Sequence, residues 1–442
     1  ERAIREAGGH LVAGGMAEVT GLFGFPKALE NAPERAARAA LEVRRRLSDS
    51  LGQEQLLLPC AAVTRVTVAL DRSVDAAPPV RDLMPRALAM LDDASPGEVL
   101  VTTDVAPVLE TAFQLRGAGA EGVWSIVGLR RRTERLALAA TGSGGFIGRE
   151  AELQRILREL SSVCDGHGRV LQILGEPGAG KTRLLYELRT LVTPRDIAFR
   201  LGRCDPQTTG APYELLTDLV RDVCGVDDTD GPEELHAKVR RLRHLGLSPR
   251  ETRVFGGLFG LEYPVDPVRD LGSRPRVLWL LEGMRRMLHA LGRDQPMVVA
   301  LEDLQWLDAS SGDVVRMLAR AVHDMRVLLL LTIRPGYDLS ISEDVADRMM
   351  LQPLDIESVR GLAAQALGVE RLDEELASWI TSRTSGNPGF VVELCRMLRE
   401  SGAVEVRRRR AKATSPLEDL DVPGSIQELV AATVDGLKSG ER

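Results

Sequence analysis

One glycine-rich segment constrains the fold of this chain more than any other feature: Gly175-Glu176-Pro177-Gly178-Ala179-Gly180-Lys181-Thr182. It fits the pattern G-x-x-x-x-G-K-[ST], which has a physical meaning only between a β-strand and a helix. An apolar run at residues 169–174 precedes it, and residues 183–192 carry apolar side chains at helical spacing. The segment therefore predicts a strand, a glycine loop and a helix in immediate succession.

A loop of this kind is suited to holding phosphate. Its backbone N–H groups point at a phosphate chain at the helix N-terminus, where the helix dipole favours anions. Lys181 would reach the β- and γ-phosphates, and the Thr182 hydroxyl would ligate Mg²⁺. The alternative is a glycine turn beside a surface lysine, but only five lysines occur in 442 residues, so a chance match is rare. We therefore predict that the chain binds a nucleoside triphosphate.

Length and composition favour a soluble globular protein of two or three domains. Hydrophobic residues make up 44% of the chain and charged residues 27%, which is ordinary for such proteins. The net charge of −7 argues against a dedicated nucleic-acid binder, because it offers phosphates no overall basic field. The longest apolar run, residues 327–333, is too short to cross a membrane, so we expect no membrane segment.

The cysteines predict a reducing, cytoplasmic environment. They are scattered along the chain without C-x-x-C spacing, as expected for buried thiols and not for a disulfide framework or zinc site. Their positions are Cys60, Cys164, Cys204, Cys224 and Cys395. The chain opens at Glu1 without a methionine, so we interpret it as a fragment whose upstream segments are not visible.

Residues 1–137 mix strand and helix patterns. Residues 11–13 and 19–23 predict a hairpin, 34–47 and 80–91 predict helices, and 99–103 predict a strand. Residues 138–145 are small and glycine-rich, which is typical of an interdomain linker. From 146 to 345, apolar strands at 170–174, 197–202, 297–301 and 327–332 alternate with helical segments and predict a parallel sheet. Residues 346–400 are mainly helical, and 401–442 begin a further module.

The strand at residues 297–301 ends in two acids, Glu302 and Asp303. A nucleotide site needs one acid to hold Mg²⁺ through water and a carboxylate to orient the attacking water. The acids could instead simply end a strand in solvent, but the upstream loop favours the catalytic role. A helix should begin near Asp308 or Ser310.

Two arginines are further candidates. Arg334 follows the strand at 327–332 and could sense the γ-phosphate, although a strand-terminal arginine is often part of a surface salt bridge. Spacing alone gives Arg149 no role.

Six motifs in order resemble those of the AAA-related STAND signalling ATPases, over roughly residues 146–435. They are Phe146-Ile-Gly-Arg-Glu-Ala-Glu-Leu153, the glycine loop, Gly202-Arg-Cys204, Leu301-Glu-Asp-Leu-Gln-Trp306 with Asp308, Thr332-Ile-Arg334, and Ser385-Gly-Asn-Pro388. The resemblance implies a P-loop NTPase of α/β class, with a parallel sheet at 146–345 and a helical lid at 346–400. It also implies that residues 401–442, around Asp421-Val-Pro-Gly-Ser-Ile426, start a winged-helix module, with residues 407–410 in a hairpin before it.

The same resemblance assigns site residues and the cofactors ATP or ADP with Mg²⁺. Glu302 and Asp303 would form the Walker B pair, with Glu302 where many relatives have aspartate, and Arg334 would be the sensor. Thr182, Glu302 and Asp303 would hold Mg²⁺, partly through water. The nucleotide-binding set would be Gly175, Glu176, Pro177, Gly178, Ala179, Gly180, Lys181, Thr182, Arg183, Arg149, and Pro388 near the adenine.

Residues 1–137 resemble the C-terminal half of a class III nucleotide cyclase, an α+β domain, in the segments 8–24, 36–47 and 96–102. Its catalytic residues are replaced. Ala17 stands at the metal-binding aspartate, Ala13 at the purine-selecting lysine, and Pro85 and Ala89 at the asparagine and arginine of the transition state. Without a carboxylate at Ala17 one metal ligand is missing, so two-metal catalysis cannot proceed normally. The resemblance therefore implies a pseudoenzyme.

The sequence thus predicts a slowly hydrolysing ATP-driven signalling switch with an inactive cyclase-like input domain. Two alternatives stay open: a nucleotide cyclase, active by itself or with a partner and regulated by the ATPase domain, and an ATP-dependent DNA-binding transcription regulator. Expected partners are ATP, unidentified signalling proteins and, on binding ATP, a second copy of the chain. Nucleic acid would bind only through a region beyond residue 442.

Overall fold

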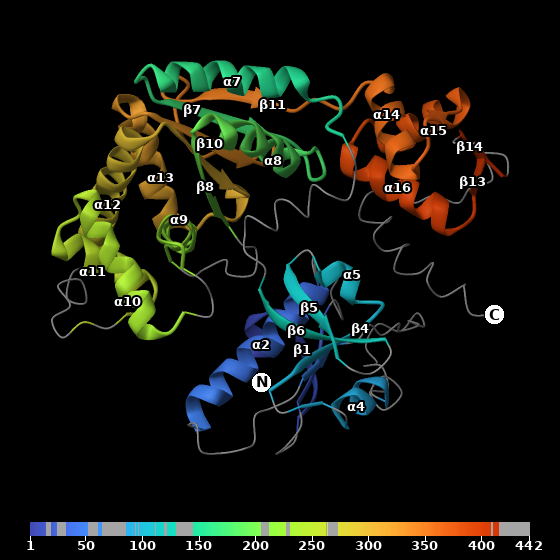
Figure 1. Cartoon of the computed structure of the whole chain (residues 1–442), viewed down its shortest axis with the longest axis horizontal. Coiled ribbons are helices and arrows are strands. Elements are labelled where there is room, and N and C mark those ends of the chain that lie inside the picture. The colour runs from blue at the N-terminus through green and yellow to red at the C-terminus, as the bar shows by residue number, and fades with distance from the viewer. Residues whose placement is uncertain are drawn as a thin grey trace. The chain divides into compact units, whose positions relative to one another are not determined.

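The computed structural model describes two compact units, Glu1–Leu138 and Ala139–Arg442. Figure 1 labels the elements of each unit. The described residues are 1–14, 19–23, 32–51, 61–63, 85–92, 94–95, 97–110, 112–118, 122–129, 145–204, 212–226, 230–261, 263, 273–407 and 410–414.

The first unit has a four-stranded sheet in the order β3-β4-β6-β5 and a separate hairpin of β1 and β2. Its elements are α1 (Arg2–Glu6), β1 (His10–Gly14), β2 (Val19–Leu22), α2 (Ala32–Leu51), β3 (Ala61–Val63), α4 (Pro85–Asp92), β4 (Val99–Thr102), α5 (Ala106–Leu109), β5 (Phe113–Gly117) and β6 (Val123–Leu129).

These elements match most of the local predictions for residues 1–137. The hairpin is antiparallel, with His10 opposite Leu22. Helix α2 is longer than predicted, and α4 is described only from Pro85 onward. Helix α2 contacts β3, β4 and α5, and its Ala37 shares one buried core with Val101, Phe113 and Ile126 of the sheet. Ala17 lies outside the described residues, so the key cyclase position has no structural description.

The second unit begins with an α/β region. Its elements up to residue 294 are α7 (Glu150–Cys164), β7 (Arg169–Leu174), α8 (Lys181–Val192), η1 (Thr193–Arg195), β8 (Ala198–Arg203), α9 (Glu214–Cys224), α10 (Pro232–Arg240), η2 (Arg241–Leu245), α11 (Pro249–Leu258) and α12 (Ser273–Asp294). Then follow β9 (Met297–Glu302), η3 (Leu304–Trp306), α13 (Ala309–Ala321), η4 (Val322–Asp324), β10 (Val327–Ile333) and β11 (Asp347–Met350).

The five strands form one sheet in the order β11-β7-β10-β9-β8, and every pairing is parallel. The predicted parallel sheet is therefore confirmed, and its four predicted strands agree with β7, β8, β9 and β10 within about one residue at each end. The fifth strand, β11, was not predicted. Its sequence is Asp-Arg-Met-Met and three of its four residues are exposed, so it lacks the apolar signal of a central strand.

Helices cover both faces of this sheet (Figure 1). The alternate side chains Leu329, Leu331 and Ile333 of β10 join one core with α9, α12 and α13. Leu328 and Leu330 point to the opposite face because strand side chains alternate, and they are also fully buried. On that side α7 contacts β7 and β10, while α8 contacts β8. A sheet buried on both faces explains why β9 and β10 are nearly continuous apolar runs.

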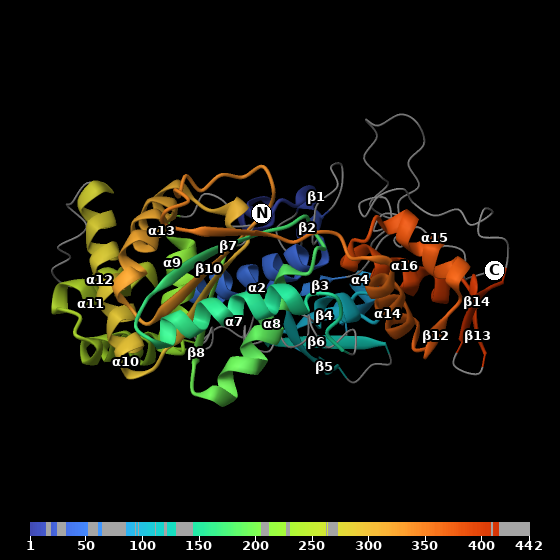
Figure 2. The ribbon, with the colours of Figure 1, turned by 90° about the horizontal axis from the view of Figure 1, so that it is seen from above.

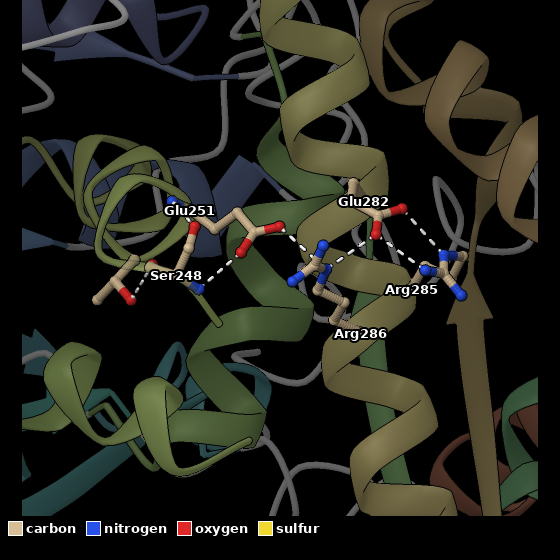
Figure 3. Close-up of polar contacts among 6 residues, drawn as sticks. Ser248, Glu251, Glu282, Arg285 and Arg286 are labelled. Carbon is tan, nitrogen blue, oxygen red and sulfur yellow. Dashed lines mark hydrogen bonds and ion pairs between the residues drawn. The ribbon is translucent and has the colours of Figure 1, made fainter. Parts of the chain in front are cut away.

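Helices α10, α11 and α12 lie between β8 and β9 in the chain. Polar side-chain contacts connect α11 with α12 (Figure 3). Ser248 and Glu251 form a capping box at the start of α11. The same Glu251 carboxylate is 3.4 Å from Arg286 on α12, which also pairs with Glu282. Glu251 is only 1% exposed, and the positive charge of Arg286 therefore partly compensates the burial of its negative charge.

The rest of the second unit is a helical group with a small sheet, grouped together in Figure 2. Its elements are α14 (Ile356–Leu367), β12 (Arg371–Leu372), α15 (Glu374–Thr384), α16 (Pro388–Glu400), β13 (Val404–Arg407) and β14 (Arg410–Ala413). The three helices share a core that includes Val359, Ile380 and Leu394. The hairpin predicted around residues 407–410 is confirmed by the β13–β14 pairing. Residues 421–426, which resembled a winged helix, lie outside the described residues.

Candidate nucleotide-binding site

The glycine loop connects β7 to α8, as its sequence predicts. Gly180 is the N-cap of α8 with φ of 92°, and Gly178 has φ of 79°. Both angles lie in the left-handed region that an L side chain rarely adopts, so these two glycines are required by the backbone. The N–H of Gly175 donates to the carbonyl of Ile333 on β10 at 3.2 Å, which anchors the start of the loop to the sheet.

Lys181 is the first residue of α8, and its ammonium folds back over the loop. It donates to the carbonyl of Gly175 at 2.5 Å and to that of Glu176 at 3.1 Å. The side chain is only 8% exposed. Burial lowers the pKa of Lys181, with Asp303 opposing and Arg334 adding to the effect. The cation is thus held inside the loop at an electrostatic cost that a phosphate would relieve.

Glu302 ends β9, which is separated from the loop strand β7 by β10. Its carboxyl is 2% exposed and forms a side-chain hydrogen bond with Thr182 on α8. Burial raises the pKa of Glu302, and Arg203 is the largest opposing influence. Parallel strands have their carboxyl ends at one edge of the sheet, which is why these residues, predicted from separate motifs, meet there.

Asp303 follows Glu302 in a left-handed conformation, with φ of 59°. Its N–H donates to the Thr332 hydroxyl at 3.1 Å, so the neighbouring strand fixes this backbone. One carboxylate oxygen accepts a hydrogen bond from the Arg203 Nε at 3.1 Å and forms an ion pair with the Nη2 of the same guanidinium at 3.0 Å. The other accepts one from Gln305 at 3.3 Å. The carboxylate therefore already has protein partners on both oxygens.

Arg203 is a site residue to which the sequence analysis gave no role, although its motif Gly202-Arg-Cys204 was noted. Two α9 carboxylates hold its strand in place: Asp218 accepts from the N–H of Arg203 at 2.9 Å, and Asp222 from that of Leu201 at 3.4 Å. Because β8 is an edge strand, these N–H groups face outward and need such partners. The only sequence signal was the spacing of two aspartates by one helical turn on α9.

Arg334 follows β10 directly, as predicted, and its guanidinium lies 5.5 Å from the ring centroid of Trp306. Its charge also contributes to lowering the pKa of Lys181, which places it in the electrostatic field of the loop. The Asp308 carboxylate caps α13 by accepting from the N–H of Ser311, which confirms the predicted helix start.

The remaining predicted residues lie around the loop in different roles. Arg149 is 5% exposed and donates to the carbonyl of Ala179 at 3.3 Å and to Glu152 at 2.9 Å, so it supports the loop. Arg183 pairs with Glu187 along α8 at 2.7 Å. Pro388 is the first residue of α16, and its neighbour Asn387 donates to the Pro177 carbonyl at 2.8 Å. The N-terminus of α16 therefore contacts the glycine loop.

The oxygen groups present fit a bound Mg²⁺. Hydroxyl and carboxylate oxygens are its usual protein ligands, and the Thr182 hydroxyl and Glu302 carboxyl are within hydrogen-bonding reach of each other. The raised pKa of Glu302 indicates that local positive charge does not fully offset its burial. A cation at this place would offset it, with Asp303 adjacent.

We expect Glu302→Gln to stabilise the protein at neutral pH in EDTA. A raised carboxyl pKa means that the folded state binds more protons, so stability falls as pH rises above the ordinary value of 4.5. Glutamine removes that charge. Urea unfolding at pH 7.5 should show a higher midpoint for the variant, and the difference should shrink as the pH approaches 4.5. A variant less stable than wild type at pH 7.5 would contradict this.

Residues 145–331 match the family described as AAA ATPase domain, and residues 356–412 match Domain of unknown function (DUF8739). An uncharacterised protein of Rhizobium meliloti (strain 1021) is 30% identical over 407 residues, covering 85% of this chain and 39% of that protein. The chain thus spans about two fifths of this relative's length.

Two solved structures are similar to parts of this chain. The Aeropyrum pernix ORC1 protein in complex with DNA is 13% identical, with 69% of each chain covered and a TM-score of 0.40. A Signal Transduction ATPase with Numerous Domains (STAND) protein with a tetratricopeptide repeat sensor from Pyrococcus horikoshii is 13% identical, covering 66% of this chain and 33% of that one, with a TM-score of 0.33.

The described part of the chain contains no helix long and apolar enough to cross a membrane. The five-stranded parallel sheet, with the glycine loop after β7 and the acid pair after β9, is that of a P-loop NTPase fold. Taken with the family match, this shows that residues 145–331 form an AAA ATPase domain.

Proposed function

We propose that this chain is an ATP-driven signalling switch that binds ATP with Mg²⁺ and hydrolyses it slowly. The observation that carries the proposal is the meeting of Lys181, Thr182, Glu302 and Asp303 at one edge of the sheet, although they come from two segments about 120 residues apart. The match of residues 145–331 to the AAA ATPase domain family supports the proposal that this site binds ATP.

Binding would begin at the glycine loop. The N–H groups at the start of α8 face the phosphates, and Lys181 exchanges the carbonyls of Gly175 and Glu176 for phosphate oxygens. That exchange relieves the cost of burying its charge. Thr182 and Glu302 would hold Mg²⁺, which when bound neutralises phosphate charge. Arg334, at the end of β10, would sense the γ-phosphate.

Hydrolysis requires a carboxylate that orients water, and Asp303 is the residue proposed for it. Its Oδ2 is held by Arg203 and its Oδ1 accepts one hydrogen bond from Gln305, so these two partners restrain the orientation in which the carboxylate can accept a hydrogen bond from water. This arrangement supports slow turnover. A switch needs that property, because each nucleotide state must last long enough to be read.

The flanking parts would carry input and output. We propose that residues 1–137 are an inactive cyclase-like domain serving as an input or docking surface, since Ala13 and Ala17 lack the side chains that cyclase chemistry needs. Helices α14, α15 and α16 would be the lid, which reports nucleotide through its contact with the loop. Signalling proteins and ATP-dependent self-association would provide the output in the cytoplasm.

The test is to incubate the purified chain with Mg²⁺ and ATP, denature it, and separate the nucleotides by chromatography. We expect retained ATP and slowly formed ADP, with no cyclic AMP. Cyclic AMP would show that the cyclase-like region is active and would overturn the proposed input role. If neither nucleotide is retained and no ADP forms, the switch proposal itself fails.

A further inference from the structure

We propose that Asn387 is a positioning residue whose side-chain amide latches the lid to the glycine loop and holds the loop in its phosphate-binding shape. This inference rests on the proposed function, because it concerns the same site. It goes beyond the motif assignment, which placed only Pro388 near the nucleotide. We call the contact formed by Asn387 and Gly389 with Pro177 and Gly178 the lid latch.

Two hydrogen bonds make up the lid latch. The Asn387 Nδ2 donates to the carbonyl of Pro177 at 2.8 Å, and the N–H of Gly389 donates to the carbonyl of Gly178 at 2.9 Å. The partners are about 210 residues apart in the chain. Both acceptors are consecutive carbonyls of the loop, so one turn of the lid holds two successive peptide groups.

The Asn387 side chain has two functions at once. Its Oδ1 accepts from the N–H of Phe390 at 3.2 Å and so caps α16, while its amide reaches the loop. Capping alone needs only an oxygen, which serine or aspartate also provides. The amide donor is what distinguishes asparagine at this position, and it is the group that contacts Pro177.

Steric fit shows how closely the two segments approach. A Cβ on Gly178 would lie 2.6 Å from the Asn387 Oδ1, and a Cβ on Gly389 would lie 2.9 Å from the Gly178 Cα. On the lid side, the Gly386 carbonyl accepts from the N–H of Leu354 at 2.8 Å. A Cβ on Gly386 would lie 2.4 Å from the Leu354 carbonyl oxygen. The turn is therefore tightly packed on both sides.

The lid latch affects phosphate binding because it fixes the orientation of peptide groups in the glycine loop. In a trans peptide the C=O and the following N–H point in opposite directions. Fixing the Pro177 carbonyl therefore fixes the Gly178 N–H. Fixing the Gly178 carbonyl fixes the Ala179 N–H, which donates to the Glu176 carbonyl at 3.1 Å and would exchange that acceptor for phosphate. Such N–H groups are the phosphate-binding groups of a glycine loop. The lid thus sets the loop's orientation, and nucleotide affinity and lid position are thermodynamically coupled.

The test separates capping from latching. Asn387→Asp keeps length and cap but loses the donor, and Asn387→Ser keeps the cap without adding charge. A matched control is Asp355→Ser at the cap of α14, where the replaced carboxylate accepts from the N–H of Ser358 at 2.8 Å. Two quantities are measured: hydrogen exchange of residues 178–179 and 389 without nucleotide, and the dissociation rate of a fluorescent ATP analogue.

We expect both Asn387 variants to raise exchange and nucleotide dissociation by about 3- to 10-fold, the effect of one lost hydrogen bond. Asp355→Ser should change neither. Unchanged exchange in both Asn387 variants would overturn the latch, and faster exchange with an unchanged dissociation rate would overturn its role in binding. If the wild type binds no analogue, the proposed switch fails, whereas the exchange measurement still decides whether Asn387 fixes the loop.

Discussion

Replacing Lys181 by alanine should lower the affinity for ATP by at least about 100-fold. Each hydrogen bond to a charged group contributes roughly 1.5–3 kcal/mol, and the ammonium would bond to two phosphate groups. The fold should survive, because burial already lowers the pKa of this lysine and its removal relieves an electrostatic cost. Titration with a fluorescent ATP analogue measures the affinity, and a urea midpoint checks the fold.

The matched control for this substitution is Lys412→Ala. Lys412 lies on β14 and is exposed, so its loss should leave ATP affinity unchanged. An equal loss of affinity in the two variants would point to a general charge effect. Unchanged affinity in Lys181→Ala would remove the basis for assigning the glycine loop as the nucleotide site.

Asp303→Asn should reduce ATP turnover by about 100-fold or more while leaving ATP binding nearly intact. A carboxylate acting on the attacking water contributes roughly 10²–10⁴ to rate, and an amide cannot accept the proton. Asparagine tolerates the left-handed backbone at this position, so the loop should keep its conformation. Single-turnover formation of ADP, beside equilibrium binding of ATP, separates the two effects.

Arg203→Ala should instead raise ATP turnover in the same single-turnover assay. Removing the guanidinium frees one carboxylate oxygen of Asp303 from a hydrogen bond and an ion pair. Because Arg203 is 52% exposed, the pair is partly screened by solvent, and we expect only about a 2- to 5-fold rise in turnover. If Asp303→Asn turned over as fast as wild type, or Arg203→Ala were slower, the assignment of Asp303 as the restrained catalytic carboxylate would fail.

Local sequence patterns predicted the central strands and the loop because each carries its own signal. Strands β9 and β10 are buried on both faces and read as apolar runs, and the glycine loop is defined by spacing alone. Strand β11 carries no such signal. It pairs with β7 through backbone hydrogen bonds while three of its four side chains remain exposed. Strand β11 forms because β7 would otherwise be the edge of the sheet, with backbone groups free to pair with it.

The candidate site also contains residues that local motifs predicted and a contact that they could not predict. Lys181, Thr182, Glu302 and Asp303 were predicted because a motif fixes residue type and spacing within one segment. The pairing of Arg203 with Asp303 could not be predicted, since it joins residues 100 positions apart that meet only through strand order.

The contact of Asn387 with Pro177 likewise follows from how the lid packs on the loop. The sequence by itself determined the strands, the loop and the identity of the acid pair, because these depend on local periodicity and spacing. Only the tertiary structure decided which groups restrain the carboxylate and hold the loop, because hydrogen bonds act over about 3 Å whatever the separation in sequence.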